Sequence, residues 1–185
     1  MMVVWICLAV YLVFSIRTTI VEKKRIANAE ANVIEQLKII RDAQNAYLAV
    51  NGRYAAGWDT LRGFLDSGNF FLTEKHETII TLPYGKDSVS VTIDTLGQKP
   101  VMDSLFRNVA RFDLATFEMV PGVDPAQPFD LWAGRIVKAG LKVNVIEVKN
   151  PKPFDPDRDE ESDRSTRLPL RFGSRTSVTT AGNWE

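Results

Sequence analysis

Three patterns of hydrophobic and polar positions follow one another along the chain. An unbroken apolar run opens the sequence, residues 26–50 carry apolar positions at helical spacing, and the residues after Glu77 alternate between apolar and polar types. Spacings of three and four residues are typical of one helix face, and a spacing of two is typical of a half-buried strand. The order of the patterns predicts a helical first third followed by strands, which is the α+β fold class.

The first run, from Met1 to Ile16, contains no charge, glycine or proline. Continued through Arg17 to Val21, it reaches about 21 residues, the length with which a helix crosses a bilayer. We therefore expect residues 1–21 to be an uncleaved transmembrane anchor. A cleaved secretory signal and a buried helix are the alternatives, although neither a basic segment before the run nor a small-residue cleavage site after it is present.

Residues 22–51 predict an amphipathic helix that continues the anchor, because the first glycine is Gly52. Its apolar positions follow one another at spacings of three and four: Ile26, Ala29, Val33, Leu37, Ile40, Ala43, Tyr47 and Val50. We assign helix packing or self-association to Ile26, Val33, Leu37, Ile40 and Tyr47. Packing within the chain's own domain is the favoured interpretation, and coiled-coil pairing through positions seven residues apart is the alternative.

The end of this helix carries the segment I-R-D-A-Q-N-A-Y-L-A-V-N-G-R-Y-A at residues 40–55. Ala43, Ala46, Tyr47, Asn51, Gly52 and Tyr54 in it match a pattern that resembles the helix end of type IV pilins and of secretion-system pseudopilins. The resemblance extends over residues 1–66, including a short helix expected near 57–66. It implies a long N-terminal helix leading into an antiparallel sheet. The basic leader and early glutamate of those families have no counterpart in the sequence, so we expect a shared architecture rather than assembly by their processing route.

The remainder of the chain predicts strands at residues 78–82, 88–93, 111–119 and 142–148, which are rich in Val, Ile, Thr and Phe. Residues 83–87 contain proline and glycine and predict a hairpin connection. An antiparallel sheet of this kind has one face to cover, and the helix stripe is the available cover. The expected fold is thus a long N-terminal helix, transmembrane and then amphipathic, packed on an antiparallel β-sheet, with a turn and short helix at 52–72 and a β-rich head at 73–150.

The C-terminal third combines aromatic residues with a charged segment. Residues 151–167 are dominated by charged and polar side chains and predict a flexible linker. Residues 168–185 contain apolar positions again and predict a docking strand or hairpin. We assign partner docking to four aromatic residues, with an aromatic plug on the sheet edge favoured for the first two: Phe129, Trp132, Phe172 and Trp184.

Composition excludes several classes of function. The 23 Lys and Arg balance 23 Asp and Glu, so no basic surface for nucleic acid is expected. The one cysteine and the one histidine, Cys7 and His76, cannot form a disulfide framework or a zinc site within one chain. Asp155, Asp157 and Asp159 alternate like calcium ligands, but Glu160 and Thr166 occupy the positions that need Gly and Glu. No metal or cofactor is predicted.

No catalytic residue is predicted either. A hydrolase built on Asp155 and Asp157, or on His76 and Glu77, is the weakest alternative, because no phosphate loop or nucleophile elbow accompanies these residues. The sequence predicts a non-enzymatic, single-pass membrane-anchored structural or scaffold subunit of a bacterial cell-envelope assembly. The alternative is a pseudopilin-like subunit of a secretion or pilus-type filament.

The expected partners are membrane lipid and other subunits of the envelope complex, further copies of the chain among them. The basic residues after the apolar run favour a cytoplasmic head by the positive-inside rule. The resemblance to pilins favours the opposite side. Following the resemblance, we expect an inner-membrane protein with a periplasmic head.

Overall fold

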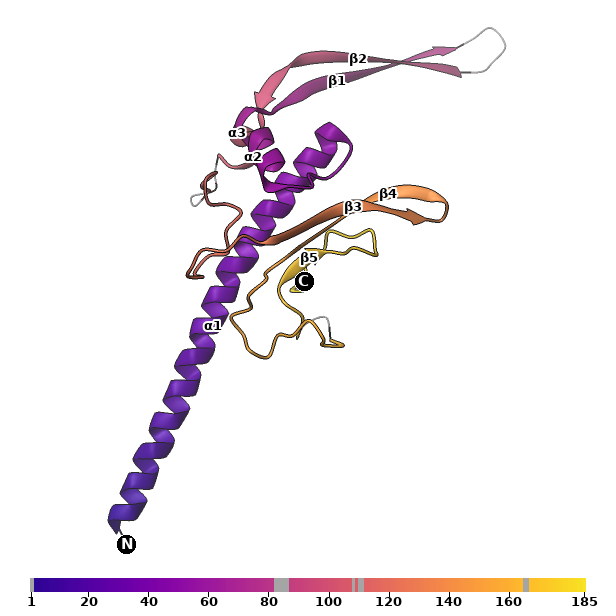
Figure 1. Cartoon of the computed structure of the whole chain (residues 1–185). Coiled ribbons are helices and arrows are strands. Elements are labelled where there is room, and N and C mark those ends of the chain that lie inside the picture. Colours follow the sequence, from indigo (N-terminus) through magenta and orange to yellow (C-terminus); the bar gives the residue numbers. More distant parts are fainter. Residues whose placement is uncertain (1, 82–86, 108, 110–111, 165–166) are drawn as a thin grey trace. The chain divides into compact units, whose positions relative to one another are not determined.

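The computed structural model has a long N-terminal helix followed by short helices and two antiparallel sheets (Figure 1). It describes residues 2–81, 87–107, 109, 112–164 and 167–185, and for residues 3, 4, 6–10, 72–81 and 87–95 the backbone path alone. Its elements follow in the order α1 (Met2–Asn51), α2 (Trp58–Ser67), β1 (Asn69–Thr81), β2 (Asp87–Pro100), α3 (Val101–Leu105), β3 (Asp130–Lys138), β4 (Leu141–Lys149) and β5 (Arg171–Gly173). The predicted α+β class is confirmed.

The chain divides into two compact units. The first unit comprises Met1–Asp42 and Ala115–Glu185, and the second unit comprises Ala43–Leu114. Helix α1 therefore contributes its first four-fifths to one unit and its last turns to the other. Each unit is described separately below.

Helix α1 is uninterrupted because no glycine or proline occurs before Gly52. It ends where predicted. Gly52 has a φ of +67°, the left-handed conformation that glycine adopts without strain, and its N–H donates to Leu48 O at 2.8 Å. The Asn51 side chain donates to Tyr47 O at 3.1 Å, which satisfies another carbonyl of the last turn.

The predicted transmembrane anchor is wrong. In the part of the chain that the structure describes, no helix has the length and apolar character that crossing a membrane requires. The physical reason lies beyond Ile16, because Arg17, Glu22, Lys23, Lys24 and Arg25 place charges close together along α1. The single-pass topology and the inner-membrane location inferred from the anchor are overturned with it.

The sheet of the first unit has the strand order β3-β4-β5, with both pairings antiparallel. A two-residue turn at Ala139 and Gly140 joins β3 to β4, and both residues have positive φ, as a type I′ turn requires. The fully buried side chains of this unit come from α1, from β4 and β5 and from the loops. They are Val33, Leu37, Ile40, Phe117, Phe129, Ile146, Val148, Leu170 and Phe172.

In the second unit, β1 and β2 form a two-stranded antiparallel sheet, with a register shift between Leu72 and Thr73. The short helix expected near 57–66 is α2, which buries Leu61 and Leu65. The buried Gln44 amide holds the loop after α1 in place, since it donates to Ala55 O at 3.2 Å and accepts from Ala55 N–H at 3.0 Å. Tyr47 packs edge-on against Phe64, with ring centroids 5.1 Å apart.

Two strand predictions need correction. Residues 114–118, within the predicted strand 111–119, form turns instead, and Met119 N–H donates to Thr116 O at 2.9 Å. Consecutive Phe117 and Glu118 are both buried, which breaks the alternation that a half-exposed strand needs. Strand β3 was not predicted. The other predicted strands at 78–82, 88–93 and 142–148 fall within β1, β2 and β4 where described, and the connection expected at 83–87 lies outside the described residues except for Asp87.

Candidate functional site

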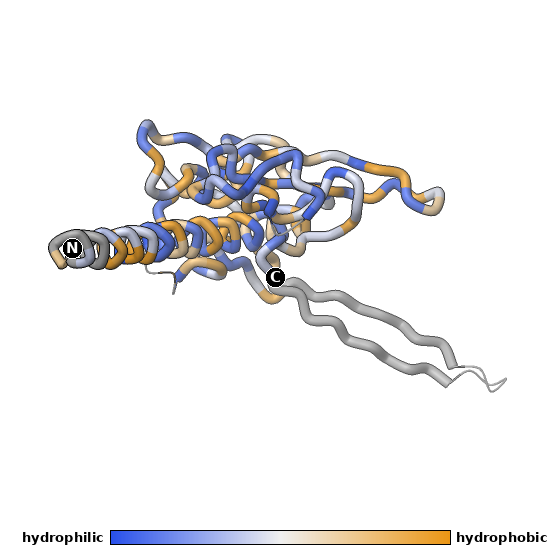
Figure 2. Tube along the Cα trace, turned by 90° about the horizontal axis from the view of Figure 1, so that it is seen from below, coloured by the Kyte–Doolittle hydropathy of each residue, from blue (hydrophilic) through white to orange (hydrophobic). Residues whose placement is uncertain are grey.

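The stretch of α1 from Tyr11 to Val21, here called the apolar segment, contains many hydrophobic positions (Figure 2). Its large hydrophobic side chains are exposed. Successive helix residues are turned by about 100°, so Tyr11, Leu12, Val13 and Phe14 point around the whole circumference. Tyr11 is 71% exposed and Phe14 is 68% exposed. Ser15, Arg17, Thr18 and Thr19 lie among these residues, but apolar side chains on all sides of a helix are normally buried, so this segment is a candidate contact surface.

The residues assigned to helix packing lie further along the same helix. Val33, Leu37 and Ile40 are fully buried in the first unit, and Tyr47 is buried in the second unit. Ile26 is only half-buried and borders the groove described below. Burial of this stripe is consistent with packing inside the chain, whereas its role in self-association stays a prediction.

Three polar side chains of α1 join the helix to separate segments of the first unit. Glu30 pairs with Arg158, whose Nη2 donates to Glu30 Oε2 at 3.2 Å. Gln36 donates to Phe117 O, and Arg41 donates to the Glu185 carboxylate at 2.6 Å. The Arg41 bond lowers the pKa of Glu185. Residues 30–41 of α1 thus bond to three segments of the first unit, at Phe117, Arg158 and Glu185.

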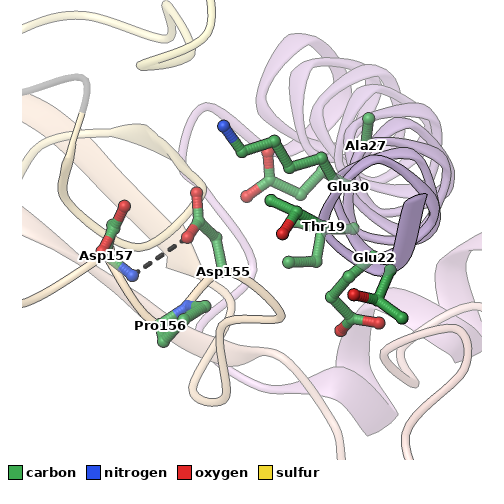
Figure 3. Close-up of a pocket in the computed structure, with 10 residues that line it drawn as sticks. Thr19, Glu22, Ala27, Glu30, Asp155, Pro156 and Asp157 are labelled. Atoms are coloured by element: carbon green, nitrogen blue, oxygen red, sulfur yellow. Dashed lines mark hydrogen bonds between the residues drawn. The ribbon is translucent and has the colours of Figure 1, made fainter. Parts of the chain in front are cut away.

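A groove of about 670 Å³ lies between α1 and the loop at Asp155–Asp157 (Figure 3). The helix contributes Thr18, Thr19, Glu22, Lys23, Ile26, Ala27 and Glu30, and the loop contributes Asp155, Pro156 and Asp157. Its lining combines four carboxylates, Glu22, Glu30, Asp155 and Asp157, with the apolar side chains of Ile26, Ala27 and Pro156. The position of the groove is notable because it begins within the apolar segment.

The chemistry of the groove is limited by how its carboxylates are engaged. Glu22 bonds to Arg25, and Asp155 Oδ1 accepts from Asp157 N–H at 2.9 Å. The hydrogen bond from Arg25 lowers the pKa of Glu22. Among the described residues, no group of three His, Cys, Asp or Glu side chains could hold a metal ion. The groove therefore presents carboxylate groups, an environment that favours a cationic ligand over an anionic one.

The aromatic residues assigned to docking fall into two environments. Phe129 and Phe172 are 1% exposed and belong to the core. Trp132 is half-buried on β3, with the Arg175 guanidinium 5.4 Å from its ring centroid. Trp184 lies against the backbone of Gly182, where an added Cβ would meet the indole at 2.3 Å. Of the assigned aromatic residues, Trp132 and Trp184 keep part of their surface accessible to a partner.

A balanced charge cluster covers one end of the β3-β4-β5 sheet. Its members are Asp130, Glu147, Lys149, Glu160, Arg171 and Arg175. Burial by itself would raise the pKa of Glu160, but bonds and charges from Lys149 and Arg171 outweigh this effect and lower it. The Glu160 bond in turn raises the pKa of Lys149. Through Glu160, these contacts join the predicted linker at residues 151–167 to the sheet. The flexibility of that linker stays a prediction.

The weaker chemical candidates lie on β1 and in the loop that follows β4. His76 and Glu77 lie on β1, in a stretch where only the backbone is described. Asp159 Oδ1 accepts from Glu161 N–H at 3.2 Å, as Asp155 does from Asp157, so these aspartates stabilise local turns. Thr166, which occupies the last position of the calcium-like pattern, lies outside the described residues.

No family model, curated protein or solved structure matches the chain. Sequence reasoning missed the contacts that join α1 to the other segments of the first unit, since a pairing such as Glu30 with Arg158 joins residues far apart in the chain. Strand β3 could have been found. Leu131, Trp132, Ile136 and Val137 all favour strands, and the Ala139-Gly140 pair is a turn signal.

Proposed function

We propose that the chain is a non-enzymatic structural subunit that acts through protein–protein contacts and assembles through the apolar segment of α1. The observation that carries the proposal is the exposure of Tyr11, Leu12, Val13 and Phe14 around the whole helix. Burying one such side chain contributes about 1.5–3 kcal/mol, so bundling of helices from several subunits is strongly favoured.

The architecture that goes with this function is a helix stripe covering the β3-β4-β5 sheet. Leu37 on α1 and Ile146 on β4 are both fully buried in the first unit, which supports contact between them. A double-mutant cycle on Leu37→Ala and Ile146→Val tests it. Residues in contact give a coupling energy of about 0.5–3 kcal/mol, and a coupling indistinguishable from zero would contradict the arrangement.

Assembly through α1 is tested with the triple variant Val13→Ser, Ile16→Ser and Ile20→Ser, whose positions share one helix face. Sedimentation equilibrium of the full chain should show oligomers for the wild type. The dissociation constant of the variant should be at least about 100-fold higher, because buried apolar surface is lost and each 1.4 kcal/mol of binding free energy changes the constant tenfold.

The matched control is Lys24→Ser, Asn28→Ser and Glu35→Ser, which places the same residue type at exposed polar positions of the same helix. Serine is about as good a helix former as Val or Ile but poorer than Lys or Glu, so the control variant loses at least as much helix propensity as the test variant. Weaker association of the test variant alone therefore reports lost apolar burial. A wild-type chain that sediments as a monomer at every concentration overturns the proposal.

A pseudopilin-like filament subunit is the second candidate. It is favoured by one observation, the uninterrupted 50-residue helix α1 ending in the Asn51-Gly52 cap. Intact-mass and N-terminal analysis of the protein purified from its native cells tests it. Removal of a leader together with N-methylation of the new terminus is the expected result, and an unmodified Met1 contradicts this candidate.

A further inference from the structure

Strand β3 forms the outer edge of the first unit's sheet. The strand order is β3-β4-β5, and within the described residues β3 pairs with β4 alone. Its side chains are half-buried or exposed throughout. An edge strand presents unpaired backbone N–H and C=O groups, which form a template for another strand.

The hydrogen bonds of β4 reveal which β3 residues present those groups. Ile146 O accepts from Ser174 N–H at 2.8 Å, and Asn150 N–H donates to Leu170 O at 2.8 Å, so the even-numbered residues of β4 face β5. The odd-numbered residues of β4 must then bond to β3. In the register with Gly134 opposite Val145, this leaves Leu131, Ala133, Arg135 and Val137 of β3 with outward-facing backbone groups.

We propose that β3 pairs with β3 of a second copy of this chain, antiparallel and centred on Gly134. The nine residues D-L-W-A-G-R-I-V-K are self-complementary in this register. Asp130 lies opposite the second copy's Lys138, Leu131 opposite Val137, Trp132 opposite Ile136 and Ala133 opposite Arg135. The opposite charges at both ends and the Leu131–Val137 and Trp132–Ile136 pairs are combinations that stabilise neighbouring strands.

Neighbouring registers lose this complementarity. A shift of two residues in one direction places Arg135 opposite Arg135, which is a like-charge pair. The same shift in the other direction places Asp130 opposite Ile136 and leaves Lys138 beyond the strand end. The centred register also makes the outward backbone groups of Ala133 and Arg135 face each other, as an antiparallel ladder requires.

From Asp130 to Lys138 the edge carries little that would block a partner, although Glu118 O accepts from Phe129 N–H at 2.9 Å just before this range. Strand β3 contains no proline, and the Arg135 guanidinium is turned toward β4, where Nε donates to Asn144 Oδ1 at 3.0 Å. Gly134 has no side chain, and the Trp132 ring lies over it, 2.7 Å from where a Cβ would be. Glycine inside a strand commonly occurs where another backbone approaches closely.

This inference rests on the proposed function, because it names a second copy as the partner of an assembling subunit. It uses a surface separate from the apolar segment of α1. The two can therefore fail independently, and the experiment is designed to separate them.

The register is tested by disulfide trapping in a Cys7→Ser background, which removes the one native thiol. Full-length chains carrying Ala133→Cys are mixed with chains carrying Arg135→Cys and oxidised. These positions are directly opposite, about 5.5 Å apart between Cα atoms, within the range that a disulfide spans. A covalent dimer is expected, and the mixture of Leu131→Cys with Val137→Cys provides a second in-register pair.

The matched control mixes Ala133→Cys with Val137→Cys, two positions on the same strand face but out of register. Diagonal neighbours are about 7–8 Å apart, so the yield should fall at least about tenfold. Equal yields from in-register and out-of-register mixtures overturn the inference. So does the absence of any disulfide dimer from chains that still sediment as oligomers, and that result leaves the α1 proposal standing.

Charge reversal provides an independent measurement. The measurement uses the triple serine variant of the apolar segment as background, so that association through α1 is weakened. In it, Lys138→Glu places the new carboxylate opposite Asp130 of the second copy at each end of the paired strands. This change should raise the dimer dissociation constant about tenfold. Lys142→Glu makes the same charge change on β4, away from the edge, and should leave the constant within about twofold. An equal response of the two variants contradicts the β3 edge as the interface.

Discussion

The two parts of α1 differ in environment although they belong to one continuous helix. Leu12 in the apolar segment is 52% exposed, whereas Leu37 is fully buried. The same contrast holds for ion pairs, since the Glu22 and Arg25 side chains are 54% and 69% exposed but those of Glu30 and Arg158 are 17% and 15% exposed. Identical residue types thus have different energetic roles, according to what lies against the helix.

The largest difference in unfolding free energy between the two parts of α1 is expected for Leu37→Ala compared with Leu12→Ala. Leu37→Ala should lower the free energy of unfolding by about 2–5 kcal/mol, because it leaves a cavity in a packed core. Leu12→Ala should change it by less than about 0.5 kcal/mol while weakening self-association. Urea unfolding monitored by circular dichroism measures both, and similar losses in the two variants would mean that the apolar segment is covered in the folded chain.

A buried polar group gives the next effect. Gln44→Leu should lower the free energy of unfolding by about 2–3 kcal/mol, because the N–H and C=O of buried Ala55 lose their partners. Asn45→Leu, at the exposed neighbouring position, is the control and should lie within about 0.5 kcal/mol of wild type. A tolerated Gln44→Leu would show that the loop after α1 does not depend on this side chain.

The two ion pairs offer a smaller comparison on the same helix. Arg158→Gln should cost about 1–2 kcal/mol of unfolding free energy, since hydrogen bonds to the half-buried Glu30 carboxylate are lost. Arg25→Gln removes a solvent-exposed pair and should leave the unfolding midpoint unchanged within error. Equal effects of the two substitutions would remove the distinction between the parts of α1.

The smallest effect is a pH dependence at Arg41. The pKa of Glu185 is lowered in the folded chain by the hydrogen bond from Arg41, so the unfolded chain binds a proton more readily. The stabilisation is fully present above the ordinary pKa of 4.5 and is lost as the pH falls through the lower folded value. Melting temperatures between pH 6 and pH 3 should therefore fall less steeply for Glu185→Gln than for wild type, and parallel curves would exclude the contribution.

Sequence signals within a few residues of one another predicted the elements that are stabilised by contacts between near neighbours in the chain, above all α1. The absence of glycine before Gly52 predicted the length of α1, and Asn51-Gly52 predicted its end. Apolar spacing identified Val33, Leu37 and Ile40, which are fully buried. The transmembrane prediction failed because it extended the apolar run through Arg17 toward a dense group of charges.

Strand β3 and the turn at 114–118 show where local signals mislead. Gly134 and Arg135 interrupt the apolar pattern of β3, yet pairing with β4 supplies the backbone bonds that hold it extended. Conversely, residues 111–119 have strand-forming side chains, but Phe117 and Glu118 are buried side by side. In both cases, contacts with distant parts of the chain outweighed the propensity of the segment.

The sequence by itself determined the helix, its termination and the α+β order, because these depend on backbone preferences and on the spacing of apolar residues. Only the tertiary structure decided which part of α1 is covered, which carboxylate meets Arg158 and which β3 residues face outward. Those features depend on contacts between residues distant in the chain, and one sequence carries no direct record of such contacts. The candidate interfaces belong to this second group, since an interface is defined by what the fold leaves exposed.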